Sequence, residues 1–139
     1  MTAFDPDNVF AKIIRGEIPS HKVYEDDVVF AMMDIMPQSD GHMLVLPKQG
    51  SRNLLDADPE VLAETMKRVQ MLARAVMTAL GADGFRMAQF NGEAADQTVF
   101  HLHFHIIPAY DGVPLKRHAA EDADHGKLAE LAQKIAAAI

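Results

Sequence analysis

Three histidines, His101, His103 and His105, occupy alternate positions within five residues of one another. Side chains of a β-strand alternate between its two faces, so a strand here would place all three imidazoles on one face, each about 6.6 Å from the next. Threonine, serine or lysine would serve a solvated face equally well. Histidine is instead suited to proton transfer, nucleophilic attack and metal binding near pH 7. The spacing therefore predicts a reactive site.

Two kinds of site fit this row of histidines. In the first, two imidazoles bind a metal ion such as zinc, and a nearby acidic residue, Glu93 or Asp96, supplies a further ligand. In the second, one neutral imidazole attacks a phosphorus atom while other imidazoles and backbone N–H groups bind the phosphate oxygens. Residues 91–98, directly before the row, offer amide, hydroxyl and backbone donors for a phosphate. The residues alone leave both interpretations open.

The helices that would position these residues are marked by their caps. Apolar residues at helical spacing predict a long helix over Pro59–Leu80, with Asp58 as its N-cap and Gly81 as its stop. A short N-terminal helix is predicted with Asp5 as its cap and Pro6 at its first position. A final short helix is predicted over 128–139.

Short apolar runs bounded by turn residues predict the strands. Their ranges are 23–25, 28–33, 43–46, 85–90 and 99–107. The strands cluster on either side of one long helix and do not alternate with helices, so the predicted fold class is α+β with an antiparallel sheet. No repeat or linker divides the chain, and we expect a single domain over 1–139.

Composition argues against several classes of function. The formal net charge is −7, whereas binding to polymeric DNA or RNA needs a basic face. The chain has no cysteine, which excludes disulfides and thiolate zinc sites and suits a reducing compartment. No basic N-terminal region precedes an apolar run, and no apolar stretch approaches roughly 18 residues. We therefore expect a cytoplasmic protein without a signal peptide or membrane span.

The run 97–108, in which His-x-His-x-His is followed by two apolar residues, resembles the signature of the histidine-triad family. Three further segments resemble the same family in the same order: 10–20 its N-terminal helix and turn, 34–42 its ribose-side loop, and 44–48 the strand after that loop. The resemblance covers about residues 8–115, leaves 116–139 as a tail and helix, and points to the Hint-like branch. It implies a five-stranded antiparallel sheet and a homodimer whose sheets join.

The resemblance also implies residue roles. His103 would attack the α-phosphate of a purine nucleotide, and water would then hydrolyse the nucleotidyl-histidine without a metal. His101 would orient His103 through its backbone carbonyl, His105 would contact the phosphate or bridging oxygen, and His42 would complete the polar cluster. The other implied contacts are Asp34 to the ribose hydroxyls, Ile35, Phe10 and Ile14 around the base, and Asn91, Gln97 and Thr98 at the phosphate or leaving group.

These roles favour a purine nucleoside phosphoramidase, which hydrolyses the P–N bond of an adenosine or guanosine monophosphoramidate. Three alternatives remain. A dinucleoside polyphosphate hydrolase would favour more cationic residues near the site than the sequence offers. A nucleotide-binding regulatory dimer would use the same residues with incidental turnover. A strand-borne zinc enzyme would use the histidines as ligands.

The chain also departs from the family pattern. Many bacterial relatives hold a structural zinc through two N-terminal cysteines, a histidine after the Pro-Lys pair and the first histidine of the triad. The first three of these positions are Asn8, Ala11 and Gly50 here. Only His101 remains, so we expect this zinc to be absent and no cofactor to be required. Position 96, commonly glycine, is Asp96, whose carboxylate would repel a phosphate.

Overall fold

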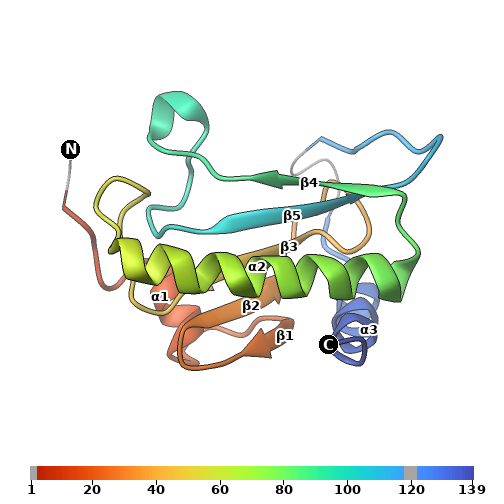
Figure 1. Cartoon of the computed structure of the whole chain (residues 1–139), viewed down its shortest axis with the longest axis horizontal. Coiled ribbons are helices and arrows are strands. Elements are labelled where there is room, and N and C mark those ends of the chain that lie inside the picture. The colour runs from red at the N-terminus through yellow and green to blue at the C-terminus, as the bar shows by residue number, and fades with distance from the viewer. Residues whose placement is uncertain (1–2, 118–121) are drawn as a thin grey trace.

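Five antiparallel strands form one sheet in the order β1-β2-β3-β5-β4 (Figure 1). The computed structural model describes residues 3–117 and 122–139. The strands span Lys22–Glu25 (β1), Val29–Met33 (β2), Met43–Pro47 (β3), Gly84–Ala88 (β4) and Phe104–Ala109 (β5). This sheet confirms the predicted α+β class. Residues 1–2 and 118–121, which the sequence assigns to the N-terminal stretch and the tail, lie outside the described residues.

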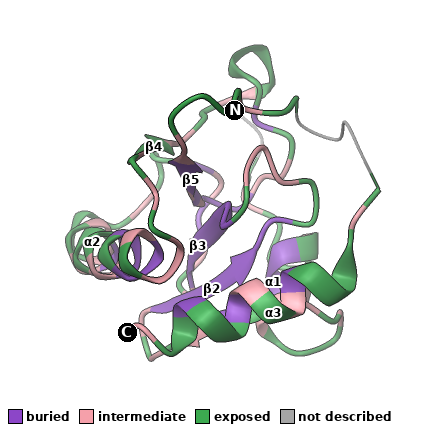
Figure 2. Cartoon of the chain, turned by 90° about the vertical axis from the view of Figure 1, so that its right-hand side faces the viewer, coloured by how far each residue is buried: buried purple, intermediate pink, exposed green. Residues whose placement is uncertain are grey.

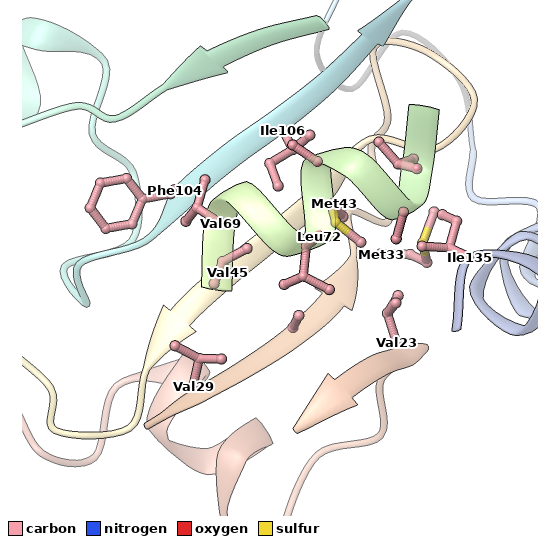
Figure 3. Packing of buried hydrophobic residues seen from close by; sticks show 14 of the residues in the cluster. Val23, Val29, Met33, Met43, Val45, Val69, Leu72, Phe104, Ile106 and Ile135 are labelled. Atoms are coloured by element: carbon pink, nitrogen blue, oxygen red, sulfur yellow. The ribbon is translucent and has the colours of Figure 1, made fainter. Parts of the chain in front are cut away.

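Different helices bury the two faces of the sheet. α2 (Pro59–Leu80) lies across one face, and α3 (His125–Ala136) packs beside it (Figure 1). This side holds the main apolar cluster, which includes Val29, Val45, Val69, Leu72, Ile106 and Ile135 (Figure 3). α1 (Val9–Ile14) covers the opposite face, whose cluster comprises Phe10, Phe30, Met32, Leu44 and Leu46. Alternate residues of β2 and β3 therefore enter different clusters, and both strands are buried throughout (Figure 2).

The bounds of α2 match the prediction from its capping residues. The Asp58 side chain accepts a hydrogen bond from the Glu60 N–H at 2.8 Å, and Gly81 ends the helix in the left-handed conformation at φ 62°. In residues 3–117 and 122–139, no helix is both long enough and apolar enough to cross a membrane.

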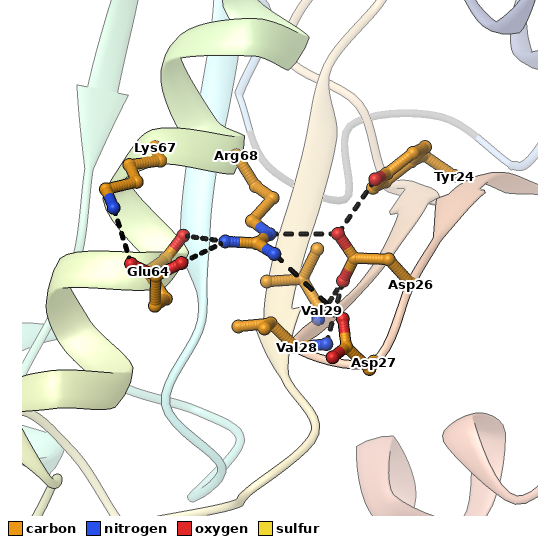
Figure 4. A network of polar contacts seen from close by, with 8 residues as sticks. All are labelled: Tyr24, Asp26, Asp27, Val28, Val29, Glu64, Lys67 and Arg68. Atoms are coloured by element: carbon orange, nitrogen blue, oxygen red, sulfur yellow. Dashed lines mark hydrogen bonds and ion pairs between the residues drawn. The ribbon is translucent and has the colours of Figure 1, made fainter.

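A polar network fastens α2 to the turn between β1 and β2 (Figure 4). Arg68 of α2 donates to Asp26 at 2.9 Å and to Glu64 at 2.9 Å, and the Tyr24 hydroxyl donates to Asp26 at 2.8 Å. Burial opposes ionisation of Asp26, but its hydrogen bonds outweigh burial and hold the pKa of this carboxyl well below its usual range. The same contacts raise the pKa of Arg68. The network fixes the turn between β1 and β2 against α2.

The final helix, predicted over 128–139, is observed as α3 over His125–Ala136, and the strand predicted over 85–90 is observed as β4 over Gly84–Ala88. Two further errors lie near the histidines. The cap of α1 is Asn8 and not Asp5, which instead organises the preceding turn by accepting the Asp7 N–H at 2.8 Å. β5 begins at Phe104, so the predicted strand over 99–107 loses its first half. The Leu102 N–H donates to the Ser51 carbonyl at 2.8 Å and not to a neighbouring strand of the sheet. The chain therefore bends before β5.

Candidate active site

His42, His103 and His105 line one cavity of about 550 Å³. The cavity opens on the face of the sheet that α1 covers, because Phe10 and Leu44 also line it. Ring centroids lie 5.1 Å apart between His103 and His105, and 5.2 Å apart between His42 and His105. The structure thus brings three of the four predicted histidines together in a space that can hold a ligand.

The His103 ring is held in one tautomer. Its Nδ1 lies 2.7 Å from the backbone oxygen of His101. A carbonyl only accepts, so Nδ1 carries the proton and Nε2 keeps its lone pair. Burial lowers the pKa of His103, which favours the neutral ring, and Phe10 packs edge-on against it with centroids 4.9 Å apart. A neutral imidazole with an unprotonated Nε2 is the form that attacks phosphorus.

The His42 and His105 rings form a directed hydrogen-bond chain. The Gln38 N–H donates to Nδ1 of His42 at 3.0 Å, so the proton of a neutral His42 is on Nε2. That Nε2 lies 2.9 Å from Nδ1 of His105 and donates to it. His105 in turn carries its proton on Nε2. One backbone amide therefore sets the tautomers of two rings, and His105 is a hydrogen-bond donor through Nε2.

Asp34, His42 and His105 offer ligand atoms within 4.8 Å of one another, close enough for one metal ion. Their hydrogen bonds do not fit such an ion. Metal binding through Nε2 of His42 would move its proton to Nδ1, where the Gln38 N–H already points. The two donors would then face each other at about hydrogen-bond distance. The acidic ligands considered from the sequence, Glu93 and Asp96, also line the cavity but are not part of this group.

His101 lies on the same face as His103, as predicted, but it does not line the cavity. Its side chain is buried, and its Nε2 donates to the Pro47 carbonyl at 2.9 Å. The alternation of faces persists, because Leu102 and Phe104 both enter the main apolar cluster while the Phe10 ring of the opposite face contacts both His101 and His103. The His101 ring is kept out of the cavity because residues from the start of the chain enclose it. Burial lowers the pKa of His101 as well. The link between the two residues is the backbone carbonyl of His101, which is the contact that the family resemblance implies.

The predicted nucleotide contacts divide into two groups. Phe10, Asp34, Gln97 and Thr98 line the cavity. Ile35, Ile14 and Asn91 are not among its lining residues within the described chain: Ile35 is exposed, Ile14 packs against the smaller apolar cluster, and Asn91 accepts the Leu54 N–H.

Asp34 and Gln97 line the cavity and also hydrogen-bond to the backbone around it. Asp34 uses one carboxylate oxygen to accept the Met36 N–H at 2.8 Å, and the other lies 3.3 Å from Nε2 of His42. Gln97 spans the loop before the triad, because it accepts the Gly92 N–H and donates to the carbonyl of Arg52. The roles of these residues toward a nucleotide stay predictions.

Several lining residues escaped the sequence reasoning. They are Met36, Gln38, Leu44, Phe90, Val99 and Ile107. Gln38 acts through its backbone N–H, which no side-chain pattern can reveal. Phe90 packs edge-on against His105 with centroids 5.6 Å apart. Its position next to the Asn91–Gly92 turn signal was the one available hint.

The family resemblance implies a site for a structural zinc, but the residues at that site in this chain do not fit a zinc ion. Nδ1 of His101 already accepts a hydrogen bond from Asn8 at 3.1 Å. A Cβ at Gly50 would lie 2.4 Å from the Phe4 ring and 2.9 Å from the His101 ring, so a histidine there would collide with both. Ala11 is buried and has no donor atom. Aromatic and amide groups fill the space.

The sequence model of the HIT domain family matches residues 15–112, and the chain belongs to this family. It is 44% identical over 102 residues to adenylylsulfatase HINT3 of Arabidopsis thaliana, covering 73% of this chain but 52% of that longer relative. It is 36% identical to adenosine 5'-monophosphoramidase HNT1 of Saccharomyces cerevisiae, covering 93% of this chain and 80% of that relative.

The fold comparison agrees with the family assignment. A crystal structure of a Hit-like protein from Bartonella henselae, described as involved in cell-cycle regulation and solved with an unknown ligand, is 55% identical. It superposes with a TM-score of 0.94 over 99% of this chain and 100% of that chain.

Proposed function

We propose that this chain is a hydrolase that releases a nucleoside 5'-monophosphate from its leaving group through a nucleotidyl-histidine at His103. The observation that carries the proposal is the 2.7 Å hydrogen bond from Nδ1 of His103 to the His101 carbonyl. It leaves the unprotonated Nε2 as the nucleophilic atom of a ring that lines the cavity. The relatives named as an adenylylsulfatase and an adenosine 5'-monophosphoramidase support hydrolysis at a nucleotide phosphorus.

The proposed reaction has two steps. Nε2 of His103 attacks the α-phosphorus, and the bond from phosphorus to the leaving group breaks. The leaving atom takes up a proton from water as this bond breaks, so the leaving group departs in neutral form. Nε2–H of His105 donates a hydrogen bond at this place, and the His42 contact keeps the His105 proton on Nε2. Water then cleaves the P–N bond to His103: its oxygen joins phosphorus, Nε2 of His103 regains its lone pair, and the proton that water loses returns to solvent, which balances the proton taken up in the first step. No metal is needed for either step.

We further propose that the leaving group is an amine, which makes the enzyme a purine nucleoside phosphoramidase. Three carboxylates, from Asp34, Glu93 and Asp96, line the cavity, and none of its lining residues in the described chain is lysine or arginine. Carboxylates disfavour an anionic sulfate or polyphosphate and tolerate a neutral or cationic amine. The dinucleoside polyphosphate hydrolase is disfavoured for the same reason.

Trapping the intermediate tests the covalent step. The protein is mixed with an adenosine monophosphoramidate labelled at phosphorus and denatured in alkali, in which a phosphorus–histidine bond survives. The label should map to His103 and vanish in His103→Ala, while His21→Ala, which removes a histidine outside the cavity, should retain it. Label on another residue, or full turnover by His103→Ala, would refute the mechanism. A nucleotide-binding dimer with incidental turnover would bind the nucleotide tightly but form the adduct only slowly.

Substrate comparison and chelation test the remaining alternatives. The phosphoramidate should have a higher kcat/KM than adenylyl sulfate or a dinucleoside tetraphosphate, because the latter two place anions beside the carboxylates. Turnover should be unchanged after dialysis against EDTA. Loss of turnover that added zinc restores would revive the zinc enzyme, and a preference for the sulfate would overturn the amine assignment.

The homodimer implied by the family resemblance would fit a groove on the other side of the molecule. β4 lies at one edge of the sheet. Phe85 and Met87 of β4 expose 45% and 49% of their surface, and Met66 of α2 exposes 40%, around a hollow of about 840 Å³. We propose that a second copy covers it, pairing β4 with β4. Sedimentation equilibrium should give a dimer for the protein and a monomer for Met87→Glu. A monomer at all concentrations would contradict this proposal.

A further inference from the structure

The side chain of His101 is enclosed by residues from the start of the chain. The rings of Phe4 and Phe10 pack edge-on against it, with centroids 5.6 Å and 6.4 Å away. The amide of Asn8 meets its Nδ1 at 3.1 Å, and the Pro47 carbonyl meets its Nε2 at 2.9 Å. Both nitrogens of this ring are therefore hydrogen-bonded, and only 1% of the residue's surface is exposed.

The orientation of the Asn8 amide is fixed by α1. Its Oδ1 accepts the Ala11 N–H at 2.9 Å as the helix cap, so its Nδ2 faces His101. An amide nitrogen only donates, and Nδ1 of His101 must therefore accept. The proton of the neutral ring is then on Nε2, where the Pro47 carbonyl accepts it. The helix cap thus sets the tautomer of a histidine 93 residues away in sequence.

This contact is linked to His103 in two ways. The backbone carbonyl of His101 accepts the proton of Nδ1 in His103, so holding the His101 ring also holds that carbonyl. The helix that Asn8 caps carries Phe10, whose ring packs against both His101 and His103. One side chain therefore anchors both the residue that orients His103 and the helix that packs on it.

We propose that Asn8 is a positioning residue for His103, and that the Asn8–His101 hydrogen bond, closed off by Phe4, replaces the structural zinc of the bacterial relatives. This inference rests on the proposed role of His103 as the nucleophile. The space beside His101 supports it, because Phe4 occupies the place that a side chain at Gly50 would need. A neutral cluster thereby holds the first triad histidine without a metal.

Asn8→Asp tests the proposal with little change in volume. The carboxylate still accepts the Ala11 N–H, so the cap is kept, but it presents an acceptor to Nδ1 of His101 where the amide presented a donor. The ring must then carry a proton on Nδ1. We expect kcat to fall about tenfold, with KM within about twofold, because a small displacement of His103 affects the attack more than substrate binding.

The matched control is Asp5→Ala. It removes the hydrogen bond from Asp7 to Asp5 in the same N-terminal turn but leaves the Asn8 amide in place. It should lower thermal stability slightly and leave kcat unchanged. Wild-type kcat in Asn8→Asp, or an equal loss of kcat in Asp5→Ala, would overturn the proposal.

A second measurement needs no variant. The ¹⁵N chemical shifts of the His101 ring in the wild-type protein report which nitrogen carries the proton. They should show a protonated Nε2 and an unprotonated Nδ1, and the reverse would refute the Asn8 contact. Because this measurement requires no substrate, it separates the positioning role from the proposed reaction, which fails on its own if no adduct forms at His103.

Discussion

His101 and His103 are two residues apart, yet their rings lie in contrasting surroundings. The His101 ring is enclosed by Phe4, Asn8 and Phe10, with both nitrogens hydrogen-bonded. The His103 ring lines the cavity with one nitrogen bonded to the protein, and in the described residues Nε2 has no such partner. A ring with both nitrogens engaged can only support structure, whereas a ring with one nitrogen engaged is oriented and still reactive. The contrast divides the triad into a positioning and a reacting part.

The largest effect should come from removing the reacting ring. His103→Ala should lower kcat on the order of 10³-fold or more, because no other side chain would supply the nucleophile. The free energy of unfolding should change by only about 1 kcal/mol, since the ring is partly exposed in the cavity. Steady-state assays with the phosphoramidate measure kcat, and thermal unfolding measures the change in stability. A protein that loses stability and keeps turnover would reverse the proposed division.

Removing the His101 ring should lower stability more than His103→Ala does, and kcat less. His101→Ala leaves a cavity and removes the hydrogen bond of the ring to the Pro47 carbonyl, which should cost about 2–4 kcal/mol of unfolding free energy. The fall in kcat should be smaller than in His103→Ala, because the backbone carbonyl at position 101 remains. Chemical denaturation and steady-state kinetics check both. Equal effects of the two substitutions on kcat, with no difference in stability, would contradict the comparison.

The sequence predicted the parts of this arrangement that depend on local signals. Asp58 and Gly81 mark the ends of α2 because caps act within one helical turn. The alternation of His101, His103 and His105 matched a strand equally well, although the chain bends there. The bend depends on the Ser51 carbonyl and the Gln97 side chain, which bond to backbone groups distant in sequence or across the loop. Such nonlocal partners leave no period in the sequence.

The prediction of Asp5 as the cap of α1, where the structure has Asn8, failed for the same reason. Both residue types cap helices well, so local preference did not separate them. Asn8 also donates to His101, and an aspartate in its place would not. The contact that distinguishes them, between Asn8 and His101, joins residues 93 positions apart in the sequence. Side-chain chemistry could therefore predict which residues gather at the site, but not which nitrogen each histidine engages.

The pH profile should sharpen the description of His103. Its neutral form is the nucleophile, so kcat/KM should rise with pH through its pKa and then level off. Burial lowers that pKa, so the rise should be centred below the ordinary histidine value of about 6.5. Phe10→Ala exposes the ring to water and should move the rise toward that value. A wild-type rise centred above it would contradict the buried neutral ring.

The smallest expected effect concerns Asp96, the carboxylate at the cavity where relatives commonly have glycine. This residue is in the left-handed conformation at φ 72°, which glycine adopts without steric cost. Asp96→Gly should lower KM roughly threefold by removing repulsion from the nucleotide phosphate, and the effect should shrink in high salt. Asp96→Asn is the matched variant, since asparagine tolerates this conformation and carries no charge. If charge is the cause, both substitutions lower KM alike; a change in Asp96→Gly alone would assign the effect to the backbone, and the electrostatic account of the cavity would then be wrong.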